Sequence, residues 1–394
     1  MTQDIYVIGA ARTAIGTFGG GLKDVPLSQT ATTAVREALK RSGADAATVG
    51  HLVMGTVVPT EPRDAYLSRV AAIDAGLPQA APAFNVNRLC GSGLQAILMA
   101  AQSLHAGDAD VAIGAGAESM SRGAYLVPSA RWGARMGDVQ MLDYVIGALH
   151  DPFHKIHMGI TAENVAEQEG ITREMQDALA LESQQRAARA IAEGRFKSQI
   201  VPVEIAGRKG TVLFDTDEHV RTDVTLDQLA KMKPAFKREG GTVTAGNASG
   251  INDGAGAVVL ATGAAVKAQG LKPIARLVSH GHAGLDPKVM GLGPVPATKI
   301  ALQRAGLKIS DIDVIEANEA FAAQACAVAK LLDFDPAKVN PNGSGISLGH
   351  PIGATGAIIT TKALYELQRI QGRYALVTMC IGGGQGIAAI FERV

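Results

Sequence analysis

A six-residue stretch, Ala38-Leu-Lys-Arg-Ser-Gly43, recurs far along the chain as Ala301-Leu-Gln-Arg-Ala-Gly306. In both places an apolar run that is typical of a helix ends at a glycine, the residue that most readily forms a left-handed C-cap. A second pair of strings, Val86-Asn87 and Val339-Asn340, precedes the third expected helix of each part. Because these short matches fall at equivalent places in one order of elements, they indicate a duplicated unit.

Both parts alternate β-like and helix-like runs, a pattern that predicts an α/β fold in which helices cover a sheet. In the first part we expect strands at 5–10, 51–58, 84–87 and 110–116, and helices at 29–42, 65–75 and 91–106. In the second part we expect strands at 274–280, 314–317, 338–340, 374–380 and 387–391, and helices at 296–305, 320–332 and 354–371.

An insertion divides the first half. The strand that would match 387–391 is 255–261, so residues 117–251 lie between the last two strands of that half. We therefore expect a first half formed by 1–116 and 252–271, an inserted domain at 117–251 and a second half at 272–394. A helix expected over 173–193, after Thr172 and before Gly194, indicates that the insertion has structure of its own.

The composition restricts the partners and the compartment of the protein. Lys plus Arg and Asp plus Glu each number 37, so the net charge is zero, and we expect no nucleic-acid or membrane partner. Three widely spaced cysteines without a Cys-x-x-Cys pair favour free thiols in a reducing compartment. The start of the chain lacks the layout of a signal peptide, so we expect a cytoplasmic protein.

Two of the three cysteines lie beside flexible glycine backbone. Cys90 stands in Asn87-Arg-Leu-Cys-Gly-Ser-Gly93, at the start of an expected helix, where unpaired N–H groups and the helix dipole lower a thiol pKa. Cys380 runs directly into Gly382-Gly-Gly384, a turn whose N–H groups could stabilise an oxyanion. These positions favour a nucleophile and an acid/base. The plainer alternatives are a small residue that closes a buried helix and a glycine hairpin at a sheet edge.

His350 is the counterpart of Cys90 in the second half, in Gly349-His-Pro-Ile-Gly353. A twofold association of the halves would bring the two helix N-termini together, so His350 could take the proton of Cys90. Asn318, in Glu316-Ala-Asn-Glu-Ala-Phe321, could orient a water. The alternatives are a structural histidine bonded to loop carbonyls and an asparagine N-cap.

Two other interpretations of the cysteines and the glycines fit less well. Cys90, His350 and Asn318 permit a papain-like protease, but their order in the chain is wrong and Cys380 would have no role. The glycine run that begins at Gly343 lacks the Lys-Ser/Thr ending of a phosphate loop. Cys326 lies in an alanine-rich helical run without an activating partner, so we expect it in the core.

Three histidines raise the question of a metal. His150, His154 and His157 have near-helical spacing, but Pro152 interrupts the segment and no cysteine or well-placed carboxylate completes a site. We therefore expect no bound metal.

The four motifs around Cys90, Asn318, His350 and Cys380 resemble the active-site motifs of the thiolase family, in the family's order and over essentially the whole chain. The resemblance is greatest to bacterial β-ketothiolases of the tetrameric type associated with polyhydroxyalkanoate precursors. It implies a layered αβαβα fold of two pseudo-symmetric βαβαβαββ halves with an inserted loop domain. It also implies a homotetramer, a dimer of dimers, assembled through residues 121–142 with Trp132 as an anchor.

The resemblance implies acyl transfer between CoA thioesters without a separate cofactor. Cys90, helped by His350, would attack an acyl-CoA, and Cys380 would then deprotonate acetyl-CoA, whose carbanion condenses to a 3-ketoacyl-CoA. The reverse reaction is thiolysis by CoA. One oxyanion site would use the N–H groups of Cys90 and Gly382, and the other would use His350 with a water held by Asn318.

The resemblance also assigns the inserted domain to CoA. Arg221 and Ser249 would contact its adenosine and pantetheine parts, with ordinary loop packing as the alternative for each contact. The residues expected to line the tunnel and acyl pocket are Leu149, His157, Met158, Phe236, Met290, Ala320 and Phe321. A non-catalytic CoA or acyl-CoA binding protein remains an alternative, as does a decarboxylating ketosynthase, although those enzymes typically carry a histidine in place of the second cysteine.

Overall fold

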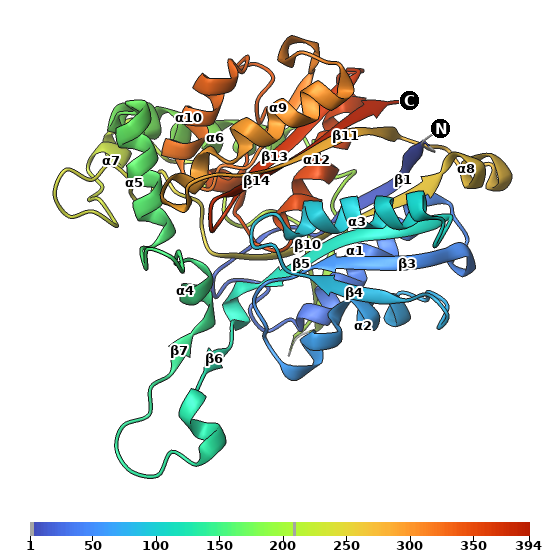
Figure 1. Ribbon diagram of the computed structural model, residues 1–394, viewed down its shortest axis with the longest axis horizontal. Coiled ribbons are helices and arrows are strands. Elements are labelled where there is room, and N and C mark those ends of the chain that lie inside the picture. The colour runs from blue at the N-terminus through green and yellow to red at the C-terminus, as the bar shows by residue number, and fades with distance from the viewer. Residues whose placement is uncertain (1–3, 208–209) are drawn as a thin grey trace.

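The computed structural model describes residues 4–207 and 210–394, and a mixed sheet forms its centre (Figure 1). Nine strands follow the order β12-β13-β14-β11-β1-β10-β5-β3-β4, and β2 (Gly16–Thr17) pairs with β10. The first half supplies β1 (Ile5–Arg12), β3 (Val49–Gly55), β4 (Ala83–Val86), β5 (Val111–Ser119) and β10 (Asn252–Thr262). The second half supplies β11 (Ala275–Gly284), β12 (Val314–Ala317), β13 (Tyr374–Ile381) and β14 (Gln385–Arg393).

The two halves repeat one strand order, which confirms the duplication predicted from the sequence. The first half runs β3-β5-β10-β1 and the second runs β12-β13-β14-β11, so each strand has a counterpart at the same place. The halves join where β1 pairs antiparallel with β11, through Tyr6 with Arg276 and Val7 with Ala275. Each half therefore presents equivalent strand ends to one shared region.

The prediction of a strand at 338–340 is wrong. Val339 forms only an isolated parallel bridge to Ile315, at the place where β4 lies beside β3 in the other half. Asn340 has a φ of 44°, which ends extended pairing. Its side chain binds the backbone of Ala317 instead, with Oδ1 accepting the N–H at 2.9 Å and Nδ2 donating to the carbonyl at 2.8 Å.

Helices lie in three layers. On one outer face α1 (Leu27–Ser42) packs against β1 and β10, and α2 (Leu67–Asp74) packs beside it. On the other, α9 (Pro294–Ala305) packs against β11 and β14. Between the strands of the first half and those of the second half lie α3 (Ser92–Ala106) and α12 (Thr355–Arg369), which contact each other (Figure 1). This is the αβαβα order expected for the fold.

The two central helices pack against each other at their N-termini. A Cβ added at Gly93 would lie 2.7 Å from the backbone nitrogen of Ala357, and one at Gly116 would lie 2.5 Å from the carbonyl oxygen of Gly353. Neither position has room for a side chain, so backbone packs directly on backbone. The structure thus confirms the expected meeting of the helix N-termini.

The segment between β5 and β10 packs on the second half. Both α5 (Met158–Glu169) and α6 (Arg173–Ala192) contact α10 (Ala322–Leu332). The fully buried pair of Arg12 and Asp217, 2.8 Å apart, ties the segment to β1. Its other elements are β6 (Tyr125–Leu126), β7 (Leu142–Asp143), α4 (Tyr144–Ala148), β8 (Val203–Gly207), β9 (Gly210–Phe214) and α7 (Leu226–Ala230).

Two short helices complete the fold, α8 (Gly263–Gln269) after β10 and α11 (Gly345–Leu348) before His350. No helix within residues 4–207 or 210–394 is both long and apolar enough to span a membrane.

Candidate active site

Three loops converge where α3 and α12 begin and β13 ends. Cys90 lies just before α3, His350 lies in the turn before α12, and Cys380 is close to the end of β13. The backbone N–H of Gly382 lies close enough to the sulfur of Cys90 to act on its pKa in the lowering direction. A Cβ at Gly382 would lie 3.1 Å from Cδ1 of Leu89, which shows that the first cysteine loop packs on the second.

Cys90 is a neutral thiol in the free protein. Its side chain is half-buried, and desolvation of the sulfur raises its pKa to about 11, although the N–H groups of Gly382 and of Cys90 itself act in the lowering direction. The expectation that the helix N-terminus lowers this pKa is therefore wrong in its net direction, because desolvation outweighs those N–H groups. Ionisation of Cys90 at neutral pH requires a base.

His350 is held as a neutral imidazole. Burial lowers its pKa to about 4. Nδ1 lies 2.6 Å from Oγ1 of Thr355, whose hydroxyl donates its single proton to the carbonyl of Pro351 at 2.9 Å. The hydrogen-bond network therefore assigns the ring proton to Nδ1, where it is donated to Thr355, and leaves the lone pair on Nε2. Nε2 is the nitrogen available as a base.

Backbone contacts fix the turn that carries His350. The N–H of His350 donates to Oδ1 of Asn252 at 2.9 Å, and the N–H of Gly353 donates to Oε2 of Glu118 at 2.7 Å. Sequence reasoning missed Asn252, Glu118 and Thr355, since none belongs to a short motif. Glu118 did carry a signal, because it is the single charged residue of the strand Val111–Ser119.

Asn318 lies beside His350 and is not an N-cap. Its Nδ2 is 3.4 Å from Nε2 of His350, and its own N–H donates to the carbonyl of Thr378 at 3.0 Å. The helix α10 begins at Ala322 behind Phe321, so the N-cap alternative is wrong. Oδ1 of Asn318 is buried and has no partner among the described residues, which leaves it free to accept a hydrogen bond from a water.

Cys380 is fully buried next to Cys90. Burial raises its pKa strongly, and the neighbouring Cys90 raises it further. The turn after it is tight, with a φ of 81° at both Gly383 and Gly384. Two neutral thiols therefore lie near each other, and neither ionises at neutral pH without a partner.

Most of the residues expected for CoA and acyl binding gather around Cys380. Met158, Met290, Ala320, Phe321 and Cys380 form one buried cluster, with Phe236 packed against it.

Aromatic contacts extend this cluster outward. The ring of His157 stacks on Phe236 at 4.6 Å, and Phe236 meets Phe321 edge-on at 6.2 Å. The N–H of Ser249 donates to the Ala320 carbonyl at 3.0 Å. These contacts make a continuous apolar wall that leads away from Cys380.

Leu149 and Arg221 lie outside that cluster. Leu149 packs in the neighbouring apolar cluster that includes Cys90, and its carbonyl accepts the Met158 N–H at 2.8 Å. Arg221 is exposed, in a shallow surface groove that it shares with Phe18 and His219. The structure thus places Arg221 apart from the cluster around Cys380.

The three histidines considered for a metal are arranged differently from a ligand set. The rings of His150 and His157 meet edge to face at 5.1 Å, and Nδ1 of His157 accepts the Gly159 N–H at 3.0 Å. His154 faces Asp286 at 3.9 Å. The described part of the chain contains no group of three or more His, Cys, Asp or Glu side chains that could hold a metal.

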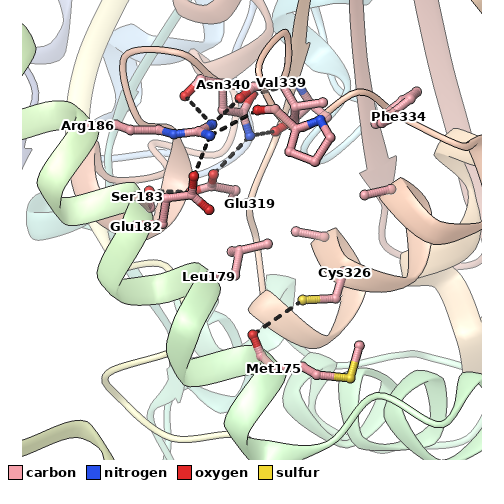
Figure 2. A pocket seen from close by; sticks show the side chains of 14 residues that line it. Met175, Leu179, Glu182, Ser183, Arg186, Glu319, Cys326, Phe334, Val339 and Asn340 are labelled. Carbon is pink, nitrogen blue, oxygen red and sulfur yellow. Dashed lines mark hydrogen bonds and ion pairs between the residues drawn. The ribbon is translucent and has the colours of Figure 1, made fainter. Parts of the chain in front are cut away.

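Cys326 borders a separate cavity of about 260 Å³ between α6 and α10 (Figure 2). It is half-buried and packs against the buried cluster around Cys380, so it lies at the edge of the core and not, as was expected, inside it. Burial raises its pKa to about 12, and its sulfur contacts the carbonyl of Met175 at 3.7 Å. At the polar end of the cavity, Glu319 is already bound by Ser183 and Asn340. None of the described residues that line this cavity is a histidine.

Comparison with protein families shows to which family this chain belongs. Residues 5–264 match the model described as thiolase, N-terminal domain, and residues 271–393 match thiolase, C-terminal domain. The chain belongs to the thiolase family. Beta-ketothiolase BktB of Cupriavidus necator is 68% identical to this thiolase over 394 residues, with 100% of both chains covered.

Solved structures agree with this thiolase chain over its whole length. The Bacillus anthracis acetyl-CoA acetyltransferase has a TM-score of 0.97 at 44% identity and covers 100% of this chain and 99% of its own. Human mitochondrial 3-ketoacyl-CoA thiolase in complex with CoA has a TM-score of 0.96 at 43% identity, with 100% and 98% covered. The predicted thiolase fold is confirmed.

The same comparisons confirm the predicted class of enzyme. The relatives are named as ketothiolases and acetyl-CoA acetyltransferases, which are acyltransferases. This chain is thus an acyltransferase of the thiolase type. Nothing in the comparisons favours a non-catalytic CoA-binding protein or a decarboxylating ketosynthase.

Proposed function

We propose that this thiolase acts as a β-ketothiolase in which Cys90 carries the acyl group and Cys380 carries a proton. In the first step Nε2 of His350 takes the Cys90 proton, the sulfur attacks the thioester carbonyl, and CoA leaves as its thiol with that proton. In the second step Cys380 passes its thiol proton to Nε2 of His350 and, as a thiolate, takes the α-proton of acetyl-CoA, and the carbanion attacks the acyl-enzyme. The product is a 3-ketoacyl-CoA, and Cys90 leaves as a thiolate that recovers a proton from His350. Thiolysis is the reverse.

The observation that carries this proposal is the approach of the Gly382 N–H to the Cys90 sulfur, close enough to act on its pKa, with Cys380 beside it. The same N–H, with that of Cys90, is placed to receive the oxyanion that forms when the sulfur attacks. Removal of one such donor typically costs about 10²- to 10³-fold in kcat. His350, protonated on Nε2 in the second step, and a water on Oδ1 of Asn318 would stabilise the second, enolate-like oxyanion.

We propose that the organisation into 1–116 with 252–271, 117–251 and 272–394 reflects this chemistry, with the middle part as the CoA-binding domain. The apolar wall of Met158, Met290 and Phe321 suits a short acyl chain, and the stack of His157 on Phe236 suits the pantetheine arm. The exposed Arg221 suits the nucleotide end. The human relative was solved in complex with CoA, which supports the proposal that this thiolase binds CoA. Because both cysteines supply the chemistry, the proposal needs no separate cofactor.

We also propose a homotetramer, built as a dimer of dimers, in the cytoplasm. The arm that carries β6 and β7 projects from the body of the molecule (Figure 1). Along it Trp132 is 83% exposed and Met136 is 99% exposed, together with Tyr125 and Met141. Apolar side chains so exposed on one arm are typical of a surface that another protein chain covers. We propose that this thiolase is of the tetrameric type associated with polyhydroxyalkanoate precursors.

Steady-state kinetics test the function directly. Acetoacetyl-CoA, 3-ketovaleryl-CoA and 3-ketohexanoyl-CoA are each mixed with the purified enzyme at a fixed CoA concentration. We expect CoA-dependent loss of the 3-ketoacyl-CoA, with values of kcat/KM that rank the three chain lengths. Binding of CoA without turnover of any of the three would contradict the proposal and favour a binding protein.

A further inference from the structure

Glu118 is a buried carboxylate whose partners are backbone N–H groups. It lies on β5 and is 1% exposed. The N–H of Val58 donates to Oε1 at 3.0 Å, and the N–H groups of Val57 and Gly353 donate to Oε2 at 3.1 and 2.7 Å. The one carboxylate therefore gathers three main-chain donors.

None of the main influences on the pKa of Glu118 is a cationic side chain of the described residues. Burial and the nearby acid Asp253 raise this pKa to about 8, whereas the three N–H groups act in the lowering direction and favour the carboxylate, so the acid and carboxylate forms coexist near neutral pH. A buried carboxylate destabilises a fold by several kcal/mol unless its hydrogen bonds compensate. A role in the active site explains why such a group lies here.

The three donors come from the two sides of the active site. Val57 and Val58 follow β3 and pack in the apolar cluster that includes Cys90. Gly353 belongs to the turn that carries His350. Because Gly353 also packs its carbonyl on Gly116, the turn has no room to slide past the first half.

We propose that Glu118 is the positioning residue that sets the distance between the Cys90 sulfur and Nε2 of His350. Two carboxylate oxygens accept three N–H groups, whereas a glutamine offers one oxygen and turns its own N–H donors toward the backbone donors. An aspartate is shorter by one methylene and cannot hold both loops at once. The inference rests on the proposed function, in which His350 takes the Cys90 proton.

The test compares Glu118→Gln and Glu118→Asp with Asp313→Asn in the full-length enzyme. Asp313 is a matched control, because its Oδ2 accepts two backbone N–H groups, from Arg373 at 2.7 Å and Tyr374 at 3.1 Å. It lies where β12 and β13 begin, whereas Asn318 and Cys380 lie where these strands end.

Two readouts separate positioning from folding. The first is kcat and KM for thiolysis of acetoacetyl-CoA, and the second is the single-turnover rate of Cys90 acetylation by acetyl-CoA, followed by mass spectrometry. We expect Glu118→Gln to lower kcat and the acetylation rate by about 100-fold, as a small displacement of reacting groups does. We expect KM to change by less than about 3-fold, because the proposed CoA contacts lie elsewhere. Asp313→Asn keeps the wild-type rates.

Each outcome decides one question. Wild-type kcat and acetylation in Glu118→Gln overturn the inference, as does an equal loss in Asp313→Asn. If Glu118→Gln loses its native circular dichroism, Glu118→Asp is scored by the same rates, and wild-type rates in it overturn the inference. A wild-type enzyme that neither acetylates Cys90 nor cleaves acetoacetyl-CoA contradicts the proposed function itself.

Discussion

Cys90 and Cys326 are both thiols whose pKa burial raises, to about 11 and about 12, yet their surroundings differ. The N–H of Gly382 acts on the Cys90 sulfur, which lies at the meeting of α3 and α12, and His350 is a neutral base there. Cys326 contacts the Met175 carbonyl and borders a cavity whose lining, as far as the structure describes the chain, contains no histidine. The pKa of the resting thiol therefore does not distinguish the nucleophile Cys90 from Cys326. The groups that surround each sulfur distinguish them.

Removal of each thiol in turn tests this difference between Cys90 and Cys326, with the largest effect that we expect. We expect Cys90→Ala to lower kcat for thiolysis of acetoacetyl-CoA by at least about 10⁴-fold, because the acyl carrier is lost. Cys326→Ala is the matched control and keeps kcat within about 2-fold. Activity that survives Cys90→Ala, or that falls with Cys326→Ala, would reverse the roles of the two regions.

The pH dependence of alkylation sharpens the comparison between the two thiols. With a pKa of about 11, the thiolate fraction of Cys90 rises about 10-fold per pH unit below that value. We expect iodoacetamide to label Cys90 about 100-fold faster at pH 9 than at pH 7 in the free enzyme, with no plateau between. Peptide mass spectrometry assigns the labelled site. A plateau above pH 7 would mean that Cys90 and His350 rest as an ion pair.

The buried histidine makes the Cys90 region sensitive to acid. His350 has a folded pKa of about 4 against 6.5 for the unfolded chain, so below pH 6.5 the unfolded state binds a proton that the folded state does not. Stability is therefore lost as the pH falls from 6.5 toward 4, by about 2 kcal/mol at pH 5 for this group. Urea unfolding at pH 7 and pH 5 measures the loss.

We expect His350→Gln to lose less stability than the wild type over that interval. Cys326→Ala serves as the control, since a thiol stays protonated in both states below pH 7. Equal losses in the wild type and His350→Gln would show that His350 is not held neutral by burial.

Substitution of Thr355 is expected to have the smallest effect on the active site. Its hydroxyl oxygen accepts from Nδ1 of His350 and so keeps the lone pair on Nε2. We expect Thr355→Val to lower kcat by about 10-fold, because a methyl group cannot accept that proton. Thr355→Ser restores the acceptor and recovers most of the activity. Equal kcat values for the valine and serine variants would remove Thr355 from the account.

The sequence predicted the features that depend on short, local strings. The repeat around Gly43 and Gly306 and the four motifs located the halves and the loops that converge. The missing strand at 338–340 could not be predicted, because Val339-Asn340 matches Val86-Asn87 and only the left-handed φ of Asn340 separates them.

The electrostatics of the site lay beyond sequence reasoning for a different reason. The sign of the Cys90 pKa shift depends on how much apolar surface covers the sulfur, and that surface comes from distant segments such as Val57, Val145 and Ile352. Glu118, Asn252 and Thr355 act through single contacts with the His350 turn. No spacing of residues along the sequence predicts such contacts.

The division of labour between the two cysteines of the active site is the central claim, and acetylation by acetyl-CoA tests it most directly. Wild-type, Cys90→Ala and Cys380→Ala enzymes are each incubated with acetyl-CoA, and the modified residue is identified by mass spectrometry. We predict that Cys380→Ala accumulates an acetyl group on Cys90 but forms no acetoacetyl-CoA, whereas Cys90→Ala stays unmodified. An acetyl group on Cys380 in either the wild type or Cys90→Ala would contradict the account.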